Sequence, residues 1–333
     1  MKVTYGQIKA EITRVLVNYG FDEASAEESA TLFAENSVDG VLSHGVNRFP
    51  RVVSYIEKGY IDVKAQPRRV TSLGALEKWD GNLGMGNLNA KRSMARAIEL
   101  AEQYGIGAVA LRNTNHWMRG GTYGWQAAEA GFIGMCWTNT LPAMPAWGAK
   151  DARIGNNPFI IAIPRKDGHV VVDAAMAQYS YGKIEASKFK GEQLPYPGGY
   201  DENGKLTTDP ATIMKTRRVL PIGFWKGCGF AIALDLVAAA MSEGNTTCAV
   251  AQLGGDELGL SQMFIAFDLK TATGAADAER LINEAIAYIK ASSPVSEHVP
   301  IMYPGEPELT ERRRNLKEGV EVEDSVWEAI TAM

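Results

Sequence analysis

The segment Gly84-Met85-Gly86-Asn87-Leu88-Asn89 is the stretch that decides the fold class. A Rossmann nucleotide site needs GxGxxG between a strand and a helix, so that backbone amides and the helix N-terminus hold the pyrophosphate. Here Asn89 stands where the third glycine is required, and a second near match, residues 227–232, has a bulky residue at that place. The sequence therefore predicts a fold that is not a Rossmann fold.

Helices and strands alternate irregularly on both sides of this segment, which is typical of a mixed α/β fold. Thr4 and Asp22 suit N-caps of two amphipathic helices that end at Gly20 and Gly40. The segments 197–209 and 292–307 are expected to be a surface excursion and a long irregular connection. Hydrophobic patterns predict strands at 76–79, 108–111, 132–138, 159–163, 170–172 and 263–267, and further helices at 47–58, 89–104, 123–130, after 229, and at 275–291.

Composition and charge indicate a globular protein. The chain has 333 residues, enough for about two domains, and 46% of them are hydrophobic. Its 34 Lys and Arg against 39 Asp and Glu give a net charge of -5, so we expect no nucleic-acid partner. The one dense basic run, Arg312-Arg313-Arg314, is expected to be a solvated helix face.

Cysteine usage and hydropathy indicate the compartment. Three cysteines are too few and too widely spaced for a disulfide framework, so a reducing compartment is expected. Residues 1–5 lack the apolar region of a signal peptide, and the weakly polar run from Cys228 to Met241 is short for a membrane span. We therefore expect a soluble cytoplasmic protein with no membrane partner.

Several chemical motifs are missing from the sequence. A GxxxxGK string at 199–205 is followed by Leu206 where a P-loop needs Ser or Thr, and no GxSxG is found. No histidine lies in HExxH or near a cysteine at metal-ligand spacing, so we expect no metal site. The histidines of the chain are His44, His116, His169 and His298.

His44 and Arg48 form the first candidate constellation. His44 lies in a glycine-flanked loop, and Arg48 and Arg51 follow at a predicted helix start, where a cation opposes the macrodipole unless an anion binds there. A carboxylate suits the planar fork of Arg48, and His44 is then placed to donate a proton to a neighbouring oxygen. The alternative is an exposed loop histidine beside two solvated arginines.

The segment Arg112-Asn113-Thr114-Asn115-His116-Trp117-Met118-Arg119-Gly120-Gly121 is a second candidate. It follows an apolar run that suits a buried strand, and ligand-binding loops often lie at that position. Asn115 and His116 are the candidate pocket residues. The alternative is a loop whose asparagines bond their own backbone while its rings only pack.

Two further positions suit a nucleotide. Lys226 precedes a long apolar helix and is placed to reach a phosphate, while Trp225 offers a flat ring for stacking. Asp173 ends a predicted strand, as a ribose-binding carboxylate does, although such an Asp is also a common helix cap.

Several of these motifs occur in the same order in the type-2 malate/L-lactate dehydrogenase family, which the sequence resembles over nearly its whole length. Two longer strings, Asn115 to Gly121 and Phe224 to Gly227, resemble the 2,3-diketo-L-gulonate reductase branch of that family. The shared motifs are Ser43 to Pro50, Arg112 to Gly121, Gly155 to Pro158, Lys226-Gly227 and Pro304-Gly305-Glu306.

The resemblance implies a fold and an assembly. The family has a non-Rossmann fold built on a mainly antiparallel central sheet with surrounding helices, and it usually forms homodimers. Residues 1–120 with 255–333 are expected to form the substrate and dimerisation region, and residues 121–254 the NAD-binding region.

The resemblance also implies the chemistry. The expected reaction is NAD(P)H-dependent reduction of a 2-oxo acid, with His44 as proton donor, NAD as cofactor and NADP as a possible alternative. Arg48, Asn115 and His116 are placed in the substrate pocket by physical inference. The cofactor contacts that carry over from the family are His169, Val170, Val171, Val172, Asp173, Ala174, Ala175, Trp225, Lys226, Gly305, Glu306 and Pro307.

The same resemblance implies 2,3-diketo-L-gulonate as the expected substrate, whose C2 carbonyl would become the hydroxyl of 3-keto-L-gulonate. Two alternatives remain open from the sequence. One is a malate, L-lactate or other 2-hydroxy-acid dehydrogenase on the same scaffold. The other is a nucleotide-binding partner protein without turnover.

Overall fold

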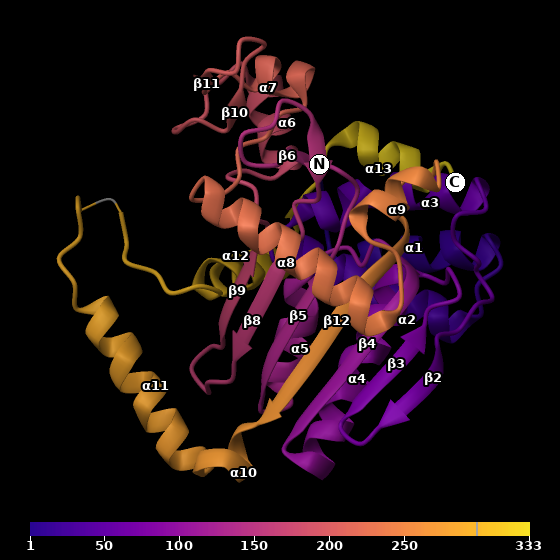
Figure 1. Cartoon of the computed structure of the whole chain (residues 1–333), viewed down its shortest axis with the longest axis vertical. Coiled ribbons are helices and arrows are strands. Elements are labelled where there is room, and N and C mark those ends of the chain that lie inside the picture. The colour runs from indigo at the N-terminus through magenta and orange to yellow at the C-terminus, as the bar shows by residue number, and fades with distance from the viewer. Residues whose placement is uncertain (298) are drawn as a thin grey trace.

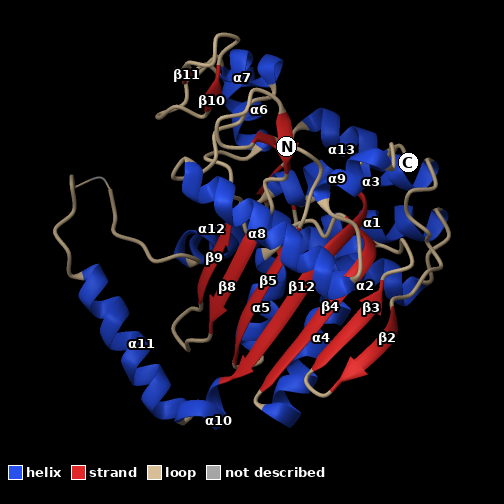
Figure 2. Cartoon of the chain, in the orientation of Figure 1, coloured by secondary structure: helices blue, strands red, loops and turns tan. Residues whose placement is uncertain are grey.

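The computed structural model describes residues 1–297 and 299–333, and its centre is a seven-stranded sheet (Figures 1 and 2). β3 and β4 run parallel, and the neighbouring pairs on both sides of them are antiparallel. The prediction of a non-Rossmann, mainly antiparallel sheet is confirmed. In spatial order the strands are β2 (Arg68–Leu73), β3 (Leu76–Asp80), β4 (Ile106–Asn115), β12 (Leu258–Asp268), β5 (Phe132–Thr138), β8 (Phe159–Ile163) and β9 (Val170–Ala174).

β12 joins the two halves of the chain. It comes late in the sequence but lies between β4 and β5, with Phe264 opposite Val109 on one side and Cys136 on the other. The boundary expected between regions 1–120 with 255–333 and 121–254 falls between β12 and β5, so the two regions share one sheet. The functional division between them stays a prediction.

Helices cover both faces of the sheet (Figure 2). α4 (Gly86–Tyr104) and α5 (Gly121–Glu129) pack on one face, and α8 (Trp225–Ser242) crosses the other. Side chains of a strand point alternately to opposite faces, so Phe264 enters the core under α4 and α5 while Met263 packs with Ala238 of α8.

A helical layer at the N-terminus frames the candidate site. α1 (Tyr5–Asn18), α2 (Glu23–Val38) and α3 (Phe49–Glu57) share one apolar core, which α13 (Asp324–Thr331) closes. The predicted caps are confirmed, because the Thr4 side chain accepts from the Gln7 amide, and Asp22 accepts from Ser25. Two short 3₁₀ turns, η1 (Leu42–His44) and η2 (Val46–Arg48), connect α2 to α3.

The remaining elements lie around this frame, and Figure 1 shows α11 standing away from the body of the molecule. The expected excursion at 197–209 contains a small hairpin. These elements are β1 (Lys2–Val3), β6 (Met144–Pro145), β7 (Ala152–Ile154), α6 (Tyr181–Lys190), β10 (Gly199–Tyr200), β11 (Leu206–Thr207), α7 (Pro210–Thr216), α9 (Thr247–Gln252), α10 (Leu269–Thr273), α11 (Ala275–Lys290), α12 (Glu306–Glu318) and β13 (Val320–Glu321).

Several expected boundaries were wrong. β4 continues to Asn115, through residues expected in a loop, because β12 pairs with Thr114 and Asn115. β9 continues to Ala174, so Asp173 lies within the strand, opposite Ile160. The irregular connection ends before Pro307, because α12 begins at Glu306.

The basic run at 312–314 was also assigned wrongly in part. The Arg312 guanidinium donates to the buried carboxylate of Asp39, with Nη2 to Oδ2 at 3.1 Å. Arg313 and Arg314 are exposed, as expected. A run of like charges does not reveal that one of its members faces a buried anion far away in the sequence.

Candidate functional site

His44 and His116 meet between the N-terminal helices and the end of β4. Their rings stack with centroids 5.7 Å apart and an interplanar angle of 18°. The Ser43 hydroxyl lies 3.0 Å from His44 Nδ1, and the carbonyl of His44 accepts a hydrogen bond of 3.0 Å from Asn36. Within the described residues no hydrogen bond reaches His44 Nε2, so this nitrogen is available to a ligand.

The surroundings of His44 favour its neutral form. Burial lowers the pKa of the imidazole below its ordinary value of 6.5, and the positive charge of Arg48 lowers it further. The negative charges of Asp173 and Glu257 act in the opposite direction. A group with these opposing neighbours is typical of a site that exchanges protons.

His116 is held in one tautomer. The Met118 backbone N–H donates to His116 Nδ1 over 3.0 Å, so Nδ1 is the acceptor and Nε2 carries the proton. Burial, followed by the positive charge of Arg48, lowers the pKa of His116 well below 6.5. Its Nε2–H therefore belongs to a neutral ring and lies 3.8 Å from Glu257 Oε1.

Arg48 points into the same cluster and is paired with Glu257, which the sequence analysis did not single out. Arg48 Nη2 donates to Glu257 Oε2, and the Tyr55 hydroxyl lies 3.0 Å from that oxygen and 2.7 Å from Asp256 Oδ2. Arg51 lies 4.0 Å from Asp256. The anions expected at this helix start are thus carboxylates of the chain itself.

Asn115 lies beside the cluster but is committed to the backbone. Its side-chain amide donates to the carbonyls of Leu83 and Gly84, at 2.8 and 3.0 Å, and the residue is 3% exposed. These two bonds fix the backbone just before α4, at the beginning of the 84–89 segment that lacks the third glycine of a Rossmann motif. Contact between Asn115 and a substrate stays a prediction.

A buried ionic network lies near the cluster of His44, His116 and Arg48. Arg119 and Asp39 are each about 4% exposed and form an ion pair, which Arg312 joins. Arg119 Nε also lies 3.7 Å from Asp173, whose Oδ2 accepts from the Gly121 N–H over 2.8 Å. The start of α5 is therefore tied both to β9 and to the end of α2.

Two of the segments expected to bind the cofactor lie against each other. The Val171 N–H donates to the carbonyl of Pro304 over 2.9 Å. Gly305 has φ +97°, and a Cβ added there would lie 2.9 Å from the carbonyl oxygen of His169. Only glycine fits this approach, so the backbone at residues 169–171 packs directly against that of residues 304–305.

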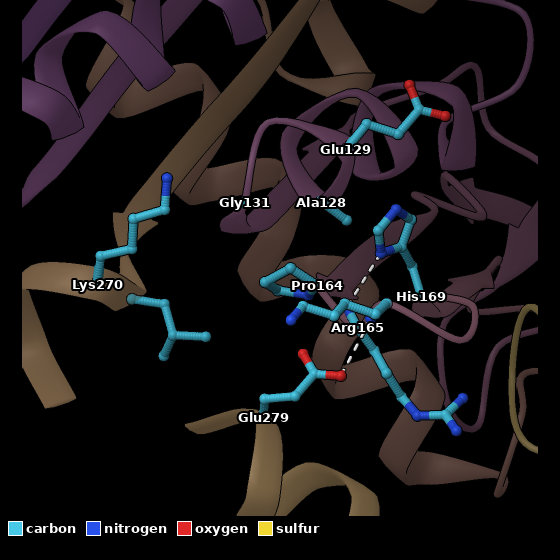
Figure 3. Close-up of a pocket in the computed structure, with 10 residues that line it drawn as sticks. Ala128, Glu129, Gly131, Pro164, Arg165, His169, Lys270 and Glu279 are labelled. Atoms are coloured by element: carbon cyan, nitrogen blue, oxygen red, sulfur yellow. Dashed lines mark hydrogen bonds between the residues drawn. The ribbon is translucent and has the colours of Figure 1, made fainter. Parts of the chain in front are cut away.

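A cavity of about 290 Å³ opens beside His169 (Figure 3). The His169 Nδ1 accepts from the Arg165 N–H over 3.0 Å, and Glu129, Lys270 and Glu279 also line the cavity. Neither His44 nor Arg48 lines it, so the cavity is separate from the histidine cluster.

Arg165 connects this cavity to the second segment. It also lines a neighbouring hollow together with Tyr303 and Glu306, and its guanidinium lies 5.4 Å from the centre of the Tyr303 ring. Arg165 therefore lines both the cavity beside His169 and the hollow beside Glu306. These two residues belong to the two segments that are expected to bind the cofactor.

Trp225 and Lys226 lie in a third place, in the first turn of α8. The Trp225 ring is 62% exposed, and Lys226 has no ion pair within the described residues. The chain before them is tied to the end of β9, because the Ile222 N–H donates to the carbonyl of Met176 over 3.0 Å. An exposed flat ring, a free cation and a helix N-terminus together suit a ring and a phosphate.

The structure thus brings His44, Arg48 and His116 into one cluster and divides the expected cofactor residues between two places. Glu257 and Tyr55 are further members of the cluster that the sequence analysis missed, and Arg119, which it quoted only as part of the second candidate segment, belongs to the ionic network beside the cluster. Within 1–297 and 299–333 no group of three His, Cys, Asp or Glu side chains is arranged to hold a metal ion. His298 lies outside the described residues.

Comparison with known proteins gives a consistent result. A family model described as malate/L-lactate dehydrogenase matches residues 3–331. The chain is 47% identical to 2,3-diketo-L-gulonate reductase of Escherichia coli K12 over 333 residues, which is 100% of both chains.

Solved structures of similar fold carry related names. Sulfolactate dehydrogenase from Methanocaldococcus jannaschii superposes with a TM-score of 0.89 at 30% identity, covering 99% of this chain and 95% of that one. A putative malate/lactate dehydrogenase from E. coli gives a TM-score of 0.92 at 29% identity, covering 99% and 93%.

Proposed function

Because this chain belongs to the malate/L-lactate dehydrogenase family and is an oxidoreductase, we propose that it reduces 2,3-diketo-L-gulonate to 3-keto-L-gulonate with NADH. One observation carries the proposal. His44, whose Nε2 has no hydrogen bond within the described residues, lies in the same cluster as the Arg48 guanidinium. The 47% identity to reductases of that name across the full length supports this substrate.

Bound NADH supplies the hydride for the C2 carbonyl. His44 Nε2 donates a proton to the C2 oxygen as negative charge develops there. Arg48 pairs with the substrate carboxylate and sets the angle of C2, while His116 packs on His44 and Asn115 fixes the backbone of Leu83 and Gly84. Ser43 at Nδ1 orients the His44 ring.

The chain's own groups fit a dinucleotide in two places. In the first place, Val172 and Asp173 are exposed beside the backbone contact between residues 169–171 and 304–305. In the second, Trp225 with Lys226 offers a ring and a cation. An extended cofactor has two nucleotide halves, which accords with a divided set of residues. NAD is the proposed cofactor, with NADP as the alternative.

We also propose that the protein is a cytoplasmic homodimer. α8 presents Phe230, Leu236 and Val237 to solvent, each more than 40% exposed, and α11 stands away from the body (Figure 1). By length and composition α8 is also apolar enough to cross a membrane, with 18 residues and a mean hydropathy of 1.3. A second copy of the chain is the proposed cover for these surfaces.

Initial rates across a panel of 2-oxo acids test the proposed substrate. We expect NADH to be oxidised fastest with 2,3-diketo-L-gulonate, and more slowly with oxaloacetate and pyruvate. Repeating the panel with NADPH gives the cofactor preference. A higher kcat/KM for oxaloacetate or pyruvate would instead assign the chain to malate or L-lactate chemistry on the same scaffold.

Replacing Lys226 tests the phosphate contact. We expect Lys226→Ala to raise the dissociation constant for NADH roughly 10- to 150-fold, because a charge-assisted contact contributes about 1.5–3 kcal/mol. The rate at saturating NADH should change much less. NADH fluorescence titration measures the binding.

Lys215→Ala is the matched control for this prediction. Lys215 is also exposed, but it is paired with Glu202 at 2.6 Å, and its loss should leave NADH binding unchanged. An unchanged dissociation constant in Lys226→Ala would move the phosphate site elsewhere.

A further inference from the structure

Glu257 occupies an unusual position in the cluster that faces the substrate. It has φ 54°, a left-handed conformation that is costly for a residue with a Cβ, and it lies just before β12. Its side chain is 19% exposed and contacts Arg48, which lies 209 residues earlier in the sequence. Strained backbone of this kind persists where the surrounding structure fixes it, and it concentrates at functional sites.

The two carboxylate oxygens of Glu257 have different surroundings. Oε2 receives Arg48 Nη2 and lies 3.0 Å from the Tyr55 hydroxyl. Burial, then the charge of Glu257, raises the pKa of Tyr55, so this hydroxyl stays a donor. Oε1 has His116 Nε2 at 3.8 Å and no hydrogen bond within the described residues. Oε1 is therefore the acceptor that remains for a ligand.

Arg48 is likewise only partly used. Nη2 is paired with Glu257, while Nε is buried without a hydrogen-bond partner and no described residue bonds to Nη1. A guanidinium has five donors in a planar fork, so a substrate carboxylate can bind to it while Glu257 keeps its own contact.

The charges of the cluster limit which acids it accepts. Arg48 and Glu257 contribute +1 and -1 and are paired with each other, while the proton that His44 donates in the proposed reaction goes to the C2 oxygen. The nearby Arg51 and Asp256 also cancel. One substrate carboxylate on Arg48 therefore leaves no described arginine or lysine free for a second carboxylate in this cluster.

We propose that Glu257 determines substrate specificity: its Oε1 accepts hydrogen bonds from hydroxyl groups of the substrate and its charge excludes 2-oxo acids with a second carboxylate. This inference rests on the proposed function and extends it to a class of substrates, the hydroxylated monocarboxylic 2-oxo acids. Rejection of a wrong partner by like charge, together with a contact to the right one, is a general route to specificity.

The test compares Glu257→Gln with wild type on 2,3-diketo-L-gulonate and oxaloacetate. We expect the ratio of the two kcat/KM values to shift toward oxaloacetate by about 10- to 100-fold, since the amide removes the repulsion and weakens acceptance of hydroxyls. Glu257→Asp keeps the charge and should retain most of the discrimination. An equal loss on both acids would overturn the proposal and leave Glu257 as a support for Arg48.

Asp256→Asn is the matched control. It removes the same charge one residue away and touches Tyr55, but Asp256 is 43% exposed and does not contact Arg48 in the described structure. Its ratio should stay within about 3-fold of wild type, as for a screened surface charge. A shift as large as that of Glu257→Gln would show a general charge effect and overturn the assignment.

A binding measurement separates this proposal from the proposed function. Titration of L-malate and L-gulonate, followed by tryptophan fluorescence, reports on the pocket without turnover. If wild type does not reduce 2,3-diketo-L-gulonate, the proposed function fails, while a shift in the binding ratio of Glu257→Gln toward L-malate still supports the role of Glu257. An unchanged binding ratio overturns that role.

Discussion

His44→Ala is expected to fold normally, to bind NADH nearly as wild type does, and to lose about 100- to 10,000-fold in kcat, the contribution of a positioned proton donor. His44 ends a short 3₁₀ turn and is not part of the apolar core of the N-terminal helices, so its removal should cost little stability. Steady-state rates, NADH fluorescence and circular dichroism measure the three properties. Near-normal turnover in the folded variant would make His116 the next candidate for the acid.

The pH dependence should accompany this loss. Reduction needs the imidazolium form of His44. The kcat/KM for reduction should therefore be highest below the pKa of His44 and decline as the pH rises through that pKa. Because burial and Arg48 lower that pKa from 6.5, the decline should begin on the acid side of neutrality. Oxidation needs the neutral ring and should rise through the same value. An alkaline decline that persists in His44→Ala would assign it to another group.

Asp39→Asn is expected to lower the free energy of unfolding by about 3–5 kcal/mol, the usual effect of breaking a buried ion pair and leaving its partner uncompensated. Asp39 and Arg119 are almost fully buried, and Arg312 donates to the same carboxylate. The substitution keeps the shape of the side chain and removes only its charge. Urea denaturation measures the difference.

The control for Asp39→Asn is Asp324→Asn. Asp324 pairs with the N-terminal ammonium at 2.7 Å, but its side chain is 73% exposed, so its loss should change the unfolding free energy little. Equal effects in the two variants would mean that the Asp39 network does not stabilise the fold.

Sequence patterns predict the local structure of this chain well where short-range signals decide it. The caps at Thr4 and Asp22 need only a side chain and an amide three residues away, and the strands 132–138 and 159–163 are apolar runs of strand length. The missing third glycine at Asn89 also correctly excluded a Rossmann fold.

Features that depend on distant partners could not be read from the pattern. The end of β4 looks like a polar loop until β12 is present to pair with it, and Arg312 looks solvated until α12 packs on α2. Glu257 follows a glycine pair and an aspartate, which indicates only a turn. One clue did exist, because Arg48 at a helix start required an anion, although the pattern did not say which one.

Transfer of deuterium from [4,4-²H₂]NADH, labelled at both C4 positions, to 2,3-diketo-L-gulonate tests the central claim most directly. The claim is that hydride reaches C2 of a 2-oxo acid while His44 supplies the proton to the oxygen. We predict one deuterium at C2 of 3-keto-L-gulonate by NMR, formed by wild type and at most one hundredth as fast by His44→Ala. Deuterium at another carbon, or no labelled product from a folded enzyme that binds NADH, would contradict the account.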